Sequence, residues 1–146
     1  ATLCDLTIAA DTAMFGQVGP KVGSVDPGWG TALLARHVGD KRAREIWYLN
    51  ERYTAQQAYD MGLVNKVVPA AELDAAVKAW TDTLAERSPT ALALAKRSFN
   101  ADSENIRGIS LASLYSVKLF YDTEESKEGV RAFNEKRKPD FHKYAK

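Results

Sequence analysis

The sequence predicts an α/β fold in which helices far outnumber strands. Residues 6–10 and 63–68 are short, largely apolar runs that end at Asp11 and Pro69, and both are predicted to be strands. At least five longer segments repeat apolar residues at helical spacing. Because so few strands cannot complete a sheet, we expect the chain to be part of a larger α/β core followed by a helical appendage.

The first strand, 6–10, is followed by a short apolar run at 13–16 and then by a loop. Five of the nine glycines lie within residues 16–30, together with two prolines. Since Pro and Gly disfavour regular helix, 17–30 is predicted to be an irregular loop. Its apolar residues, Val22, Val25 and Trp29, indicate that it is ordered. Ordered loops between a strand and a helix are favoured places for catalytic residues.

The rest of the chain is mostly helical. Thr54 and Gln57 have the spacing of a capping box, and Ser88 before Pro89 has the form of an N-cap followed by a first-turn proline. The expected helices are 31–38, 41–49, 54–62, 73–84, 88–99, 104–121 and 123–135. Helices with apolar faces and no partner of their own often pack on another subunit, so this region is also expected to mediate assembly.

Composition excludes several functions. With 20 Lys and Arg against 19 Asp and Glu, the net charge of +1 favours neither nucleic acid nor a membrane surface as a partner. The single cysteine, Cys4, cannot form an internal disulfide or a multi-cysteine zinc site, and we expect it in the core. His37 and His142 have no partners at metal-ligand spacing, so no metal site is predicted.

The chain shows no targeting segment. No apolar run approaches the roughly 20 residues of a membrane span, and no secretion signal is present, so we expect a cytoplasmic protein. The sequence starts at Ala1 within an apolar pattern and without an initiator Met. We therefore expect it to have been cut from a longer chain.

Several segments resemble, in the same order, the central and C-terminal regions of the crotonase superfamily. They are 5–10, 15–17, 23–30, 53–64, 88–96 and 133–137. The resemblance implies a spiral of ββα units leading to a helical trimerisation region, with residues 1–70 in the α/β core and 71–146 in the helical, CoA-contacting region. It also implies an acyl-CoA substrate whose thioester oxygen lies between two backbone N–H groups. Both groups belong to a half of the fold that precedes Ala1.

The residue at position 19 reduces the number of activities expected within the superfamily. Hydratases that resemble this chain have a catalytic Glu two residues after the tripeptide matching 15–17, where this chain has Gly19. Glycine cannot transfer a proton, so hydration is disfavoured. Residues 17–26 resemble two other groups of the superfamily. The 1,4-dihydroxy-2-naphthoyl-CoA synthases close a ring of o-succinylbenzoyl-CoA by a Dieckmann-type condensation, and the 2-ketocyclohexanecarboxyl-CoA hydrolases open a ring with water to form pimeloyl-CoA.

The resemblance to the synthases implies that a bound bicarbonate replaces the missing carboxylate. The residues that match its ligands are Gln17, Gly19 and Trp47. An amide, an exposed backbone N–H and an indole N–H are suitable donors for a small anion. No tightly bound cofactor is expected otherwise, and coenzyme A enters as part of the substrate.

Ser24, Asp26 and Tyr121 are the predicted catalytic residues. An Asp before a proline is most often a turn or cap residue, but the resemblance implies that Asp26 hydrogen-bonds Ser24 and the substrate's keto oxygen and orients a proton. Tyr121 could simply pack at the edge of a core, whereas the resemblance places it at the reacting carbonyl. No histidine lies near Ser24 in the sequence, so a serine nucleophile is not predicted.

Five further residues are assigned to the substrate by the resemblance. Lys21, Val22 and Gly23 are expected to bind the acyl-CoA substrate, and Phe133 and Lys136 to contact the CoA nucleotide within a trimer or a dimer of trimers. By composition alone, residues 136–138 would be a solvated basic tail.

Ring-opening hydrolysis is the leading prediction. Val18, Val25 and Pro27, with segments 86–100 and 121–123, are closer to the hydrolases than to the synthases. Ring closure by a synthase is the alternative. A third possibility is a non-catalytic assembly fragment, since the chain alone is expected to be inactive without the oxyanion donors. RNA binding would need a clustered basic face that the sequence does not show.

Overall fold

The structure is a computed structural model that describes residues 1–26 and 29–145. Pro27 and Gly28, which belong to segment 23–30 of the superfamily resemblance, lie outside the described residues, as does Lys146. The strands are β1 Ile8–Ala10, β2 Met14–Phe15, β3 Tyr53–Thr54 and β4 Lys66–Val68. The α-helices are α1 Gly30–Val38, α2 Asp40–Leu49, α3 Ala55–Asp60, α4 Leu73–Ala85, α5 Pro89–Ala101, α6 Arg107–Tyr121 and α7 Glu124–Asn134. Short 3-10 helices are η1 Pro20–Val22, η2 Ala70–Glu72, η3 Glu104–Ile106 and η4 His142–Tyr144.

These elements confirm the predicted α/β class and nearly every predicted helix and strand. They form two compact units that interleave along the sequence. Unit 1 contains mainly residues 3–15 and 53–108, and unit 2 contains mainly 16–52 and 109–146. Each unit combines segments from both sides of residue 70, and the predicted roles of 1–70 and 71–146 stay predictions.

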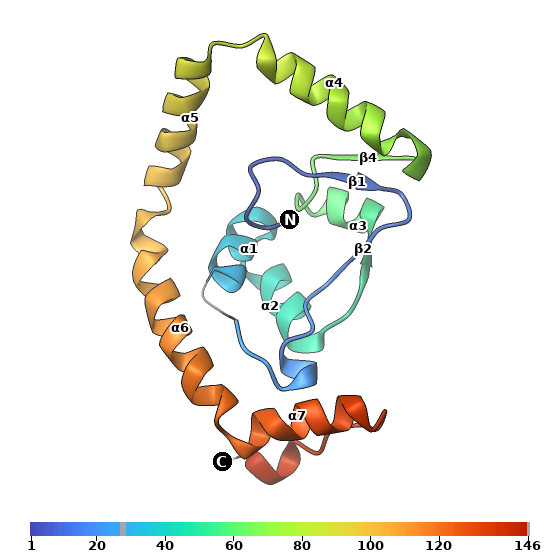
Figure 1. Cartoon of the computed structure of the whole chain (residues 1–146), viewed down its shortest axis with the longest axis vertical. Coiled ribbons are helices and arrows are strands. Elements are labelled where there is room, and N and C mark those ends of the chain that lie inside the picture. Colours follow the sequence, from blue (N-terminus) through green and yellow to red (C-terminus); the bar gives the residue numbers. More distant parts are fainter. Residues whose placement is uncertain (27–28, 146) are drawn as a thin grey trace. The chain divides into compact units, whose positions relative to one another are not determined.

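Unit 1 contains both small sheets. In the first, β1 pairs with β4 in parallel, so that Ala9 lies opposite Val67 (Figure 1). In the second, β2 pairs with β3 in antiparallel register. Helix α3 packs beside them, and its Ala55 and Ala58 are fully buried together with Ala9 and Val64. These small side chains allow the helix to lie close to the strands.

The helices of unit 1 begin where the sequence predicts. Thr54 forms a complete capping box with Gln57: its hydroxyl accepts from the Gln57 N–H, and the Gln57 side chain accepts from the Thr54 N–H. Ser88 caps α5 through a hydrogen bond from Ala91, with Pro89 in the first turn. Both caps satisfy N–H groups that a helix N-terminus leaves without a partner.

Unit 2 is built around α1, α2 and α7. Helices α1 and α2 form a hairpin broken at Gly39, whose φ of +82° favours glycine. The buried face of α2 consists of Ala43, Ile46 and Trp47. Helix α7 packs against η1. The predicted loop, 17–30, is described apart from residues 27 and 28; it contains η1, which packs on α7 within unit 2.

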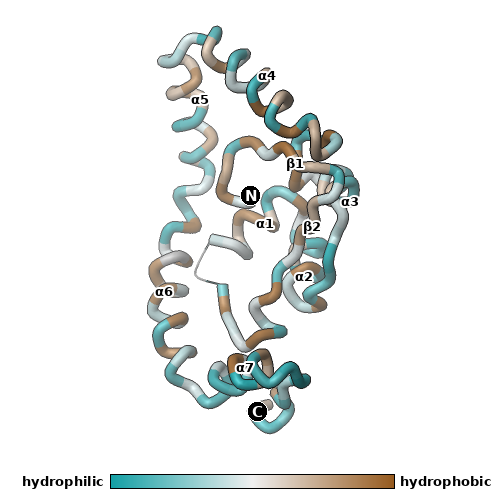
Figure 2. Tube along the Cα trace, turned by 45° about the vertical axis from the view of Figure 1, so that its right-hand side comes forward, coloured by the Kyte–Doolittle hydropathy of each residue, from teal (hydrophilic) through white to brown (hydrophobic). Residues whose placement is uncertain are grey.

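Apolar side chains remain exposed along the later helices. Figure 2 shows hydrophobic positions recurring along α4, α5 and α6. Phe99 is 79% exposed, Tyr115 74% and Leu119 71%. The predicted role of these helices in oligomerisation stays a prediction. None of the described helices has both the length and the apolar character that crossing a membrane requires.

The prediction that Cys4 is a core residue is wrong, because this side chain is exposed. Cys4 lies in a bend, and the strand predicted at 6–10 begins only at Ile8. Without strand pairing, the segment does not turn alternate side chains into a core.

Candidate active site

The loop between β2 and α1 is held by its own backbone. The Gly19 carbonyl accepts hydrogen bonds from the N–H groups of Val22 at 3.1 Å and Ser24 at 2.8 Å. Gly23, at the end of η1, has a φ of +68° and is buried. Glycine adopts this left-handed conformation without the steric cost that a Cβ brings. The turn thus sets the direction of Ser24.

Helix α7 fixes the same turn from outside. The Ser126 hydroxyl, which is buried, donates to the Gly23 carbonyl at 3.0 Å. Gly129 lies one helical turn further on, and a Cβ built there would be 2.2 Å from the Val22 carbonyl oxygen. The absence of a side chain at Gly129 is therefore what allows η1 to pack on the helix.

The structure brings together two of the three predicted catalytic residues. The hydroxyl groups of Ser24 and Tyr121 are 2.6 Å apart and hydrogen-bonded, although the residues are 97 positions apart in the chain. Tyr121 ends α6 and remains 47% exposed. A hydroxyl pair of this kind can hold or pass a proton at one point of the surface.

Asp26 is engaged at the N-terminus of α1. Its Oδ1 accepts from the Gly30 N–H at 3.1 Å, and its Oδ2 accepts from the Thr31 N–H at 2.7 Å and from the Thr31 hydroxyl at 2.6 Å. This is the cap role that the sequence alone favours for such an aspartate. Whether Asp26 also meets a substrate stays a prediction.

Trp47 lies between two glycines. A Cβ built on Gly19 would be 3.1 Å from Trp47 Cζ3 and 3.1 Å from the Ser24 carbonyl oxygen, and a Cβ on Gly30 would be 3.3 Å from Trp47 Cζ2. The indole ring thus fits against both because neither carries a side chain. Gly19 contacts the Cζ3 edge, which is across the ring system from Nε1.

The indole N–H of Trp47 is buried, and the described residues offer it no acceptor. Among residues 1–26 and 29–145, Nε1 has no hydrogen-bond partner, and the whole residue is only 8% exposed. Leaving such a group without a partner costs about 1–3 kcal/mol. An acceptor supplied from outside the chain, such as a small anion, would remove that cost, so Trp47 fits the predicted anion site.

Gln17 is tied to Trp47 through Asn50. The Asn50 amide donates to the Gln17 carbonyl at 3.0 Å and to the Trp47 carbonyl at 2.7 Å. Asn50 also ends α2, with a φ of +53°. The three predicted anion ligands, Gln17, Gly19 and Trp47, therefore all belong to unit 2. The Asn50 amide joins the main chains of Gln17 and Trp47.

The predicted substrate residues occupy different environments. Lys21 is exposed and Val22 half-buried, while Gly23 packs on α7. Phe133 is 73% exposed at the end of α7, and Lys136, just beyond it, has a φ of +53°. Contacts of these residues with an acyl-CoA stay a prediction.

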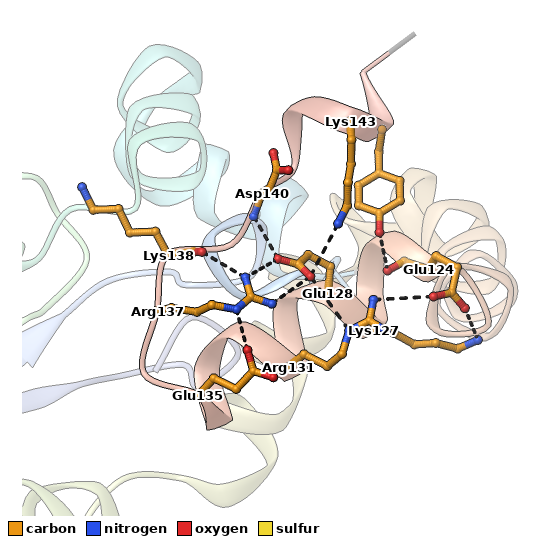
Figure 3. Close-up of polar contacts among 10 residues, drawn as sticks. Glu124, Lys127, Glu128, Arg131, Glu135, Arg137, Lys138, Asp140 and Lys143 are labelled. Carbon is orange, nitrogen blue, oxygen red and sulfur yellow. Dashed lines mark hydrogen bonds and ion pairs between the residues drawn. The ribbon is translucent and has the colours of Figure 1, made fainter.

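A buried carboxylate organises the segment around Lys136. Glu128 is 3% exposed. Its carboxylate accepts hydrogen bonds from both Nη atoms of Arg137, at 2.6 and 3.0 Å, and from the Asp140 N–H at 3.0 Å (Figure 3). The hydrogen bonds from Arg137, and after them that from Asp140, lower the pKa of Glu128 to about 2. The residues after α7 are thereby folded back onto the helix.

Sequence reasoning missed Asn50, Ser126, Glu128 and Gly129. Gly129 alone carried a signal, because a glycine inside a helical pattern often marks close packing. Arg137 was considered part of a solvated basic tail, whereas it pairs with the buried Glu128. Among the residues that the structure describes, no three His, Cys, Asp or Glu side chains are grouped as a metal site requires.

Residues 1–144 match the enoyl-CoA hydratase/isomerase family. An enoyl-CoA hydratase from Mycobacterium avium subsp. paratuberculosis K-10 is 30% identical, with a TM-score of 0.89 over 97% of this chain and 58% of its own. A carnitinyl-CoA dehydratase from Mycobacterium avium 104 is 26% identical, with a TM-score of 0.86 over 95% and 56%. A methylmalonyl-CoA decarboxylase is 30% identical, with a TM-score of 0.80 over 96% and 56%.

The chain thus spans a little more than half the length of these solved relatives, which agrees with the predicted partial fold. They are a hydratase, a dehydratase and a decarboxylase, so the finer likeness to the ring-opening hydrolases stays a prediction. The family match over residues 1–144 and the shared fold establish the broader relationship. The chain belongs to the enoyl-CoA hydratase/isomerase family, the crotonase superfamily.

Proposed function

We propose that the protein containing this chain is an acyl-CoA enzyme that breaks a carbon–carbon bond next to the thioester, opening the ring of 2-ketocyclohexanecarboxyl-CoA. Water adds to the ring ketone, the bond to the carbon beside the thioester breaks, and that carbon then gains a proton. The product is pimeloyl-CoA, with a new carboxylate at the former ketone. The oxyanion donors for the thioester are expected outside this chain.

The indole N–H of Trp47, which is buried and has no hydrogen-bond partner among the described residues, is the observation that carries the proposal. A hydratase would use a carboxylate at position 19, and glycine there leaves the proton transfer to another group. When bound, bicarbonate would supply the missing base. Trp47, Gln17 and Gly19 would hold it, and the cost of leaving Nε1 without an acceptor would favour its binding.

The Ser24–Tyr121 pair is assigned to the reacting ketone. Its hydroxyls lie 2.6 Å apart, so one can donate to the carbonyl oxygen while accepting from the other. Such donation stabilises the negative charge that develops when water adds. Asp26 orients the loop by capping α1 and keeps Ser24 at the end of the turn.

A panel of substrates tests the reaction. The protein containing this chain is incubated with 2-ketocyclohexanecarboxyl-CoA, o-succinylbenzoyl-CoA and crotonyl-CoA, and the products are followed by mass spectrometry. We expect pimeloyl-CoA from the first and no hydration of the third. Ring closure of the second without ring opening of the first would establish the synthase alternative. Efficient hydration would overturn the reasoning from Gly19.

A pair of variants tests the site. Trp47→Phe keeps an aromatic ring in the same place and removes the N–H, so we expect kcat to fall about hundredfold, the range of a lost acid–base group, with KM little changed. Trp80→Phe in α4 makes the same substitution outside the proposed site and should leave kcat unchanged. Equal activities of the two variants would show that the indole N–H has no role.

A further inference from the structure

Asn50 makes a contact that the mechanism above does not use. Its side-chain amide bridges two carbonyl groups, those of Gln17 and Trp47, at 3.0 and 2.7 Å. Gln17 lies in the loop before η1, and Trp47 in the last turn of α2. The one amide therefore joins the two segments that carry the proposed anion donors.

We propose that Asn50 is a positioning residue for the anion site: by bridging the main chain at Gln17 and Trp47, it holds their side chains in the arrangement that binds a small oxyanion of the bicarbonate type. This inference rests on the proposed function. Asn50 itself touches neither the anion nor the substrate and acts only through the two carbonyl groups.

The backbone explains why asparagine suits this place. Residue 50 ends α2 in the left-handed region, with φ +53° and ψ +36°, and its N–H donates to the Ile46 carbonyl. Asparagine and glycine are the residues that most readily end a helix in this way. Glycine would satisfy the backbone equally well but would leave both carbonyl groups without the amide. The asparagine side chain therefore contributes the bridge.

The buried indole N–H of Trp47 favours a site whose donors are held in place before an anion binds. Trp47 Nε1 is buried and has no partner in the part of the chain that the structure describes. A single donor holds a small anion weakly, and further donors help only if their positions are fixed before binding. A loop free to move at Gln17 would lose that advantage, because ordering it would then oppose binding.

The test observes bicarbonate directly. The chain has three tryptophans, Trp29, Trp47 and Trp80. In NMR spectra of the protein containing this chain, ¹⁵N-labelled indole groups therefore give few signals. The signal that disappears in Trp47→Phe is that of Trp47. Titration with bicarbonate should shift the Trp47 indole signal and give a Kd. In Asn50→Gly, which keeps the left-handed cap, we expect this Kd to rise about tenfold, the usual loss when a supporting contact behind a ligand is removed.

Two measurements separate positioning from general damage. Asn65→Ala removes a different hydrogen bond, in which the Asn65 side-chain oxygen accepts from the Thr7 N–H at 2.8 Å. This variant should leave the bicarbonate Kd unchanged. In Asn50→Gly, raising bicarbonate should restore kcat, while KM for the CoA thioester stays constant. If Asn50→Gly does not fold, Asn50→Asp replaces it with the same expectations, because aspartate tolerates the left-handed cap and a carboxylate cannot donate to either carbonyl group.

The outcomes distinguish the two proposals. If the Trp47 signal of the unmodified protein does not respond to bicarbonate, the anion site fails, and the role of Asn50 fails with it. If the unmodified protein binds bicarbonate and Asn50→Gly binds it equally well, only the role of Asn50 is overturned. Weaker binding in Asn50→Gly but not in Asn65→Ala supports both.

Discussion

Replacing Gly129 with alanine sets two physical effects against each other. Helix propensity alone favours alanine inside a helix by about 1 kcal/mol. The structure predicts the opposite result, because a Cβ on Gly129 would be 2.2 Å from the Val22 carbonyl oxygen, 2.6 Å from its carbonyl carbon and 2.8 Å from Gly23 Cα. Real Cβ contacts stay beyond 3.0 Å, so η1 and α7 would have to separate by at least 3.0 − 2.2 = 0.8 Å.

The magnitude follows from the kind of atoms that clash. Overpacking typically costs about 1–3 kcal/mol, and the upper end applies here because all three atoms belong to the backbone. Subtracting the gain in propensity leaves a net loss of about 2 kcal/mol in the free energy of unfolding. The shift would also strain the Ser126–Gly23 hydrogen bond. Because Ser24 follows Gly23, its bond to Tyr121 should lengthen and kcat should fall.

Gly108→Ala is the matched control, since Gly108 also lies in a helix. Among the described residues, and apart from its chain neighbours and the adjacent backbone of its own helix, no heavy atom lies within 4 Å of a Cβ built there. We expect that variant to be neutral or more stable by up to about 1 kcal/mol. Urea unfolding of both variants, followed by tryptophan fluorescence, measures the difference. If Gly129→Ala proved as stable as Gly108→Ala, the packing of η1 on α7 would not be as described.

Three further predictions concern a buried charge, a cap and the hydroxyl pair. Since the folded-state pKa of Glu128 is about 2, below its ordinary value of 4.5, its ionised form adds stability above pH 4.5 that is lost as the pH falls towards 2. Glu128→Gln should therefore be less stable than the unmodified protein at neutral pH, and this difference in unfolding free energy should shrink in acid. Urea unfolding from pH 2 to 7 measures it. A difference that did not change with pH would contradict the lowered pKa of Glu128. Thr54→Ala should lose about 1 kcal/mol of unfolding free energy while Thr54→Ser keeps the cap, so equal losses in urea would count against the capping box. Tyr121→Phe should lower kcat about hundredfold with little change in KM, whereas Tyr115→Phe, on the same helix, should leave kcat unchanged. Steady-state kinetics measure both variants, and equal kcat values would remove Tyr121 from the mechanism.

Features that depend on near neighbours were predictable from the sequence. The capping box at Thr54, the cap at Ser88 and the helix end at Gly39 involve residues within about four positions of one another. Their hydrogen bonds form whenever the local backbone is helical, whatever packs around it. The predicted second helix, 41–49, likewise differs from α2 by only one residue. The family was also recognisable, because its motifs are short, ordered segments of the chain.

The site depends on contacts that the sequence does not reveal. The Ser24–Tyr121 and Ser126–Gly23 hydrogen bonds join residues 97 and 103 positions apart. Glu128 looks like an ordinary exposed residue of a polar helix until the segment after α7 folds back and covers it with Arg137.

The sequence by itself determined where helices and strands begin and end, the family, and which residues are candidates for chemistry. The tertiary structure decided which candidates meet: Tyr121 reaches Ser24, Asp26 caps α1, and the Trp47 N–H is buried with no acceptor in the described part of the chain. The physical reason is range. Backbone hydrogen bonds within a helix are fixed by residues a turn apart, whereas burial and side-chain partners depend on which distant segments pack together.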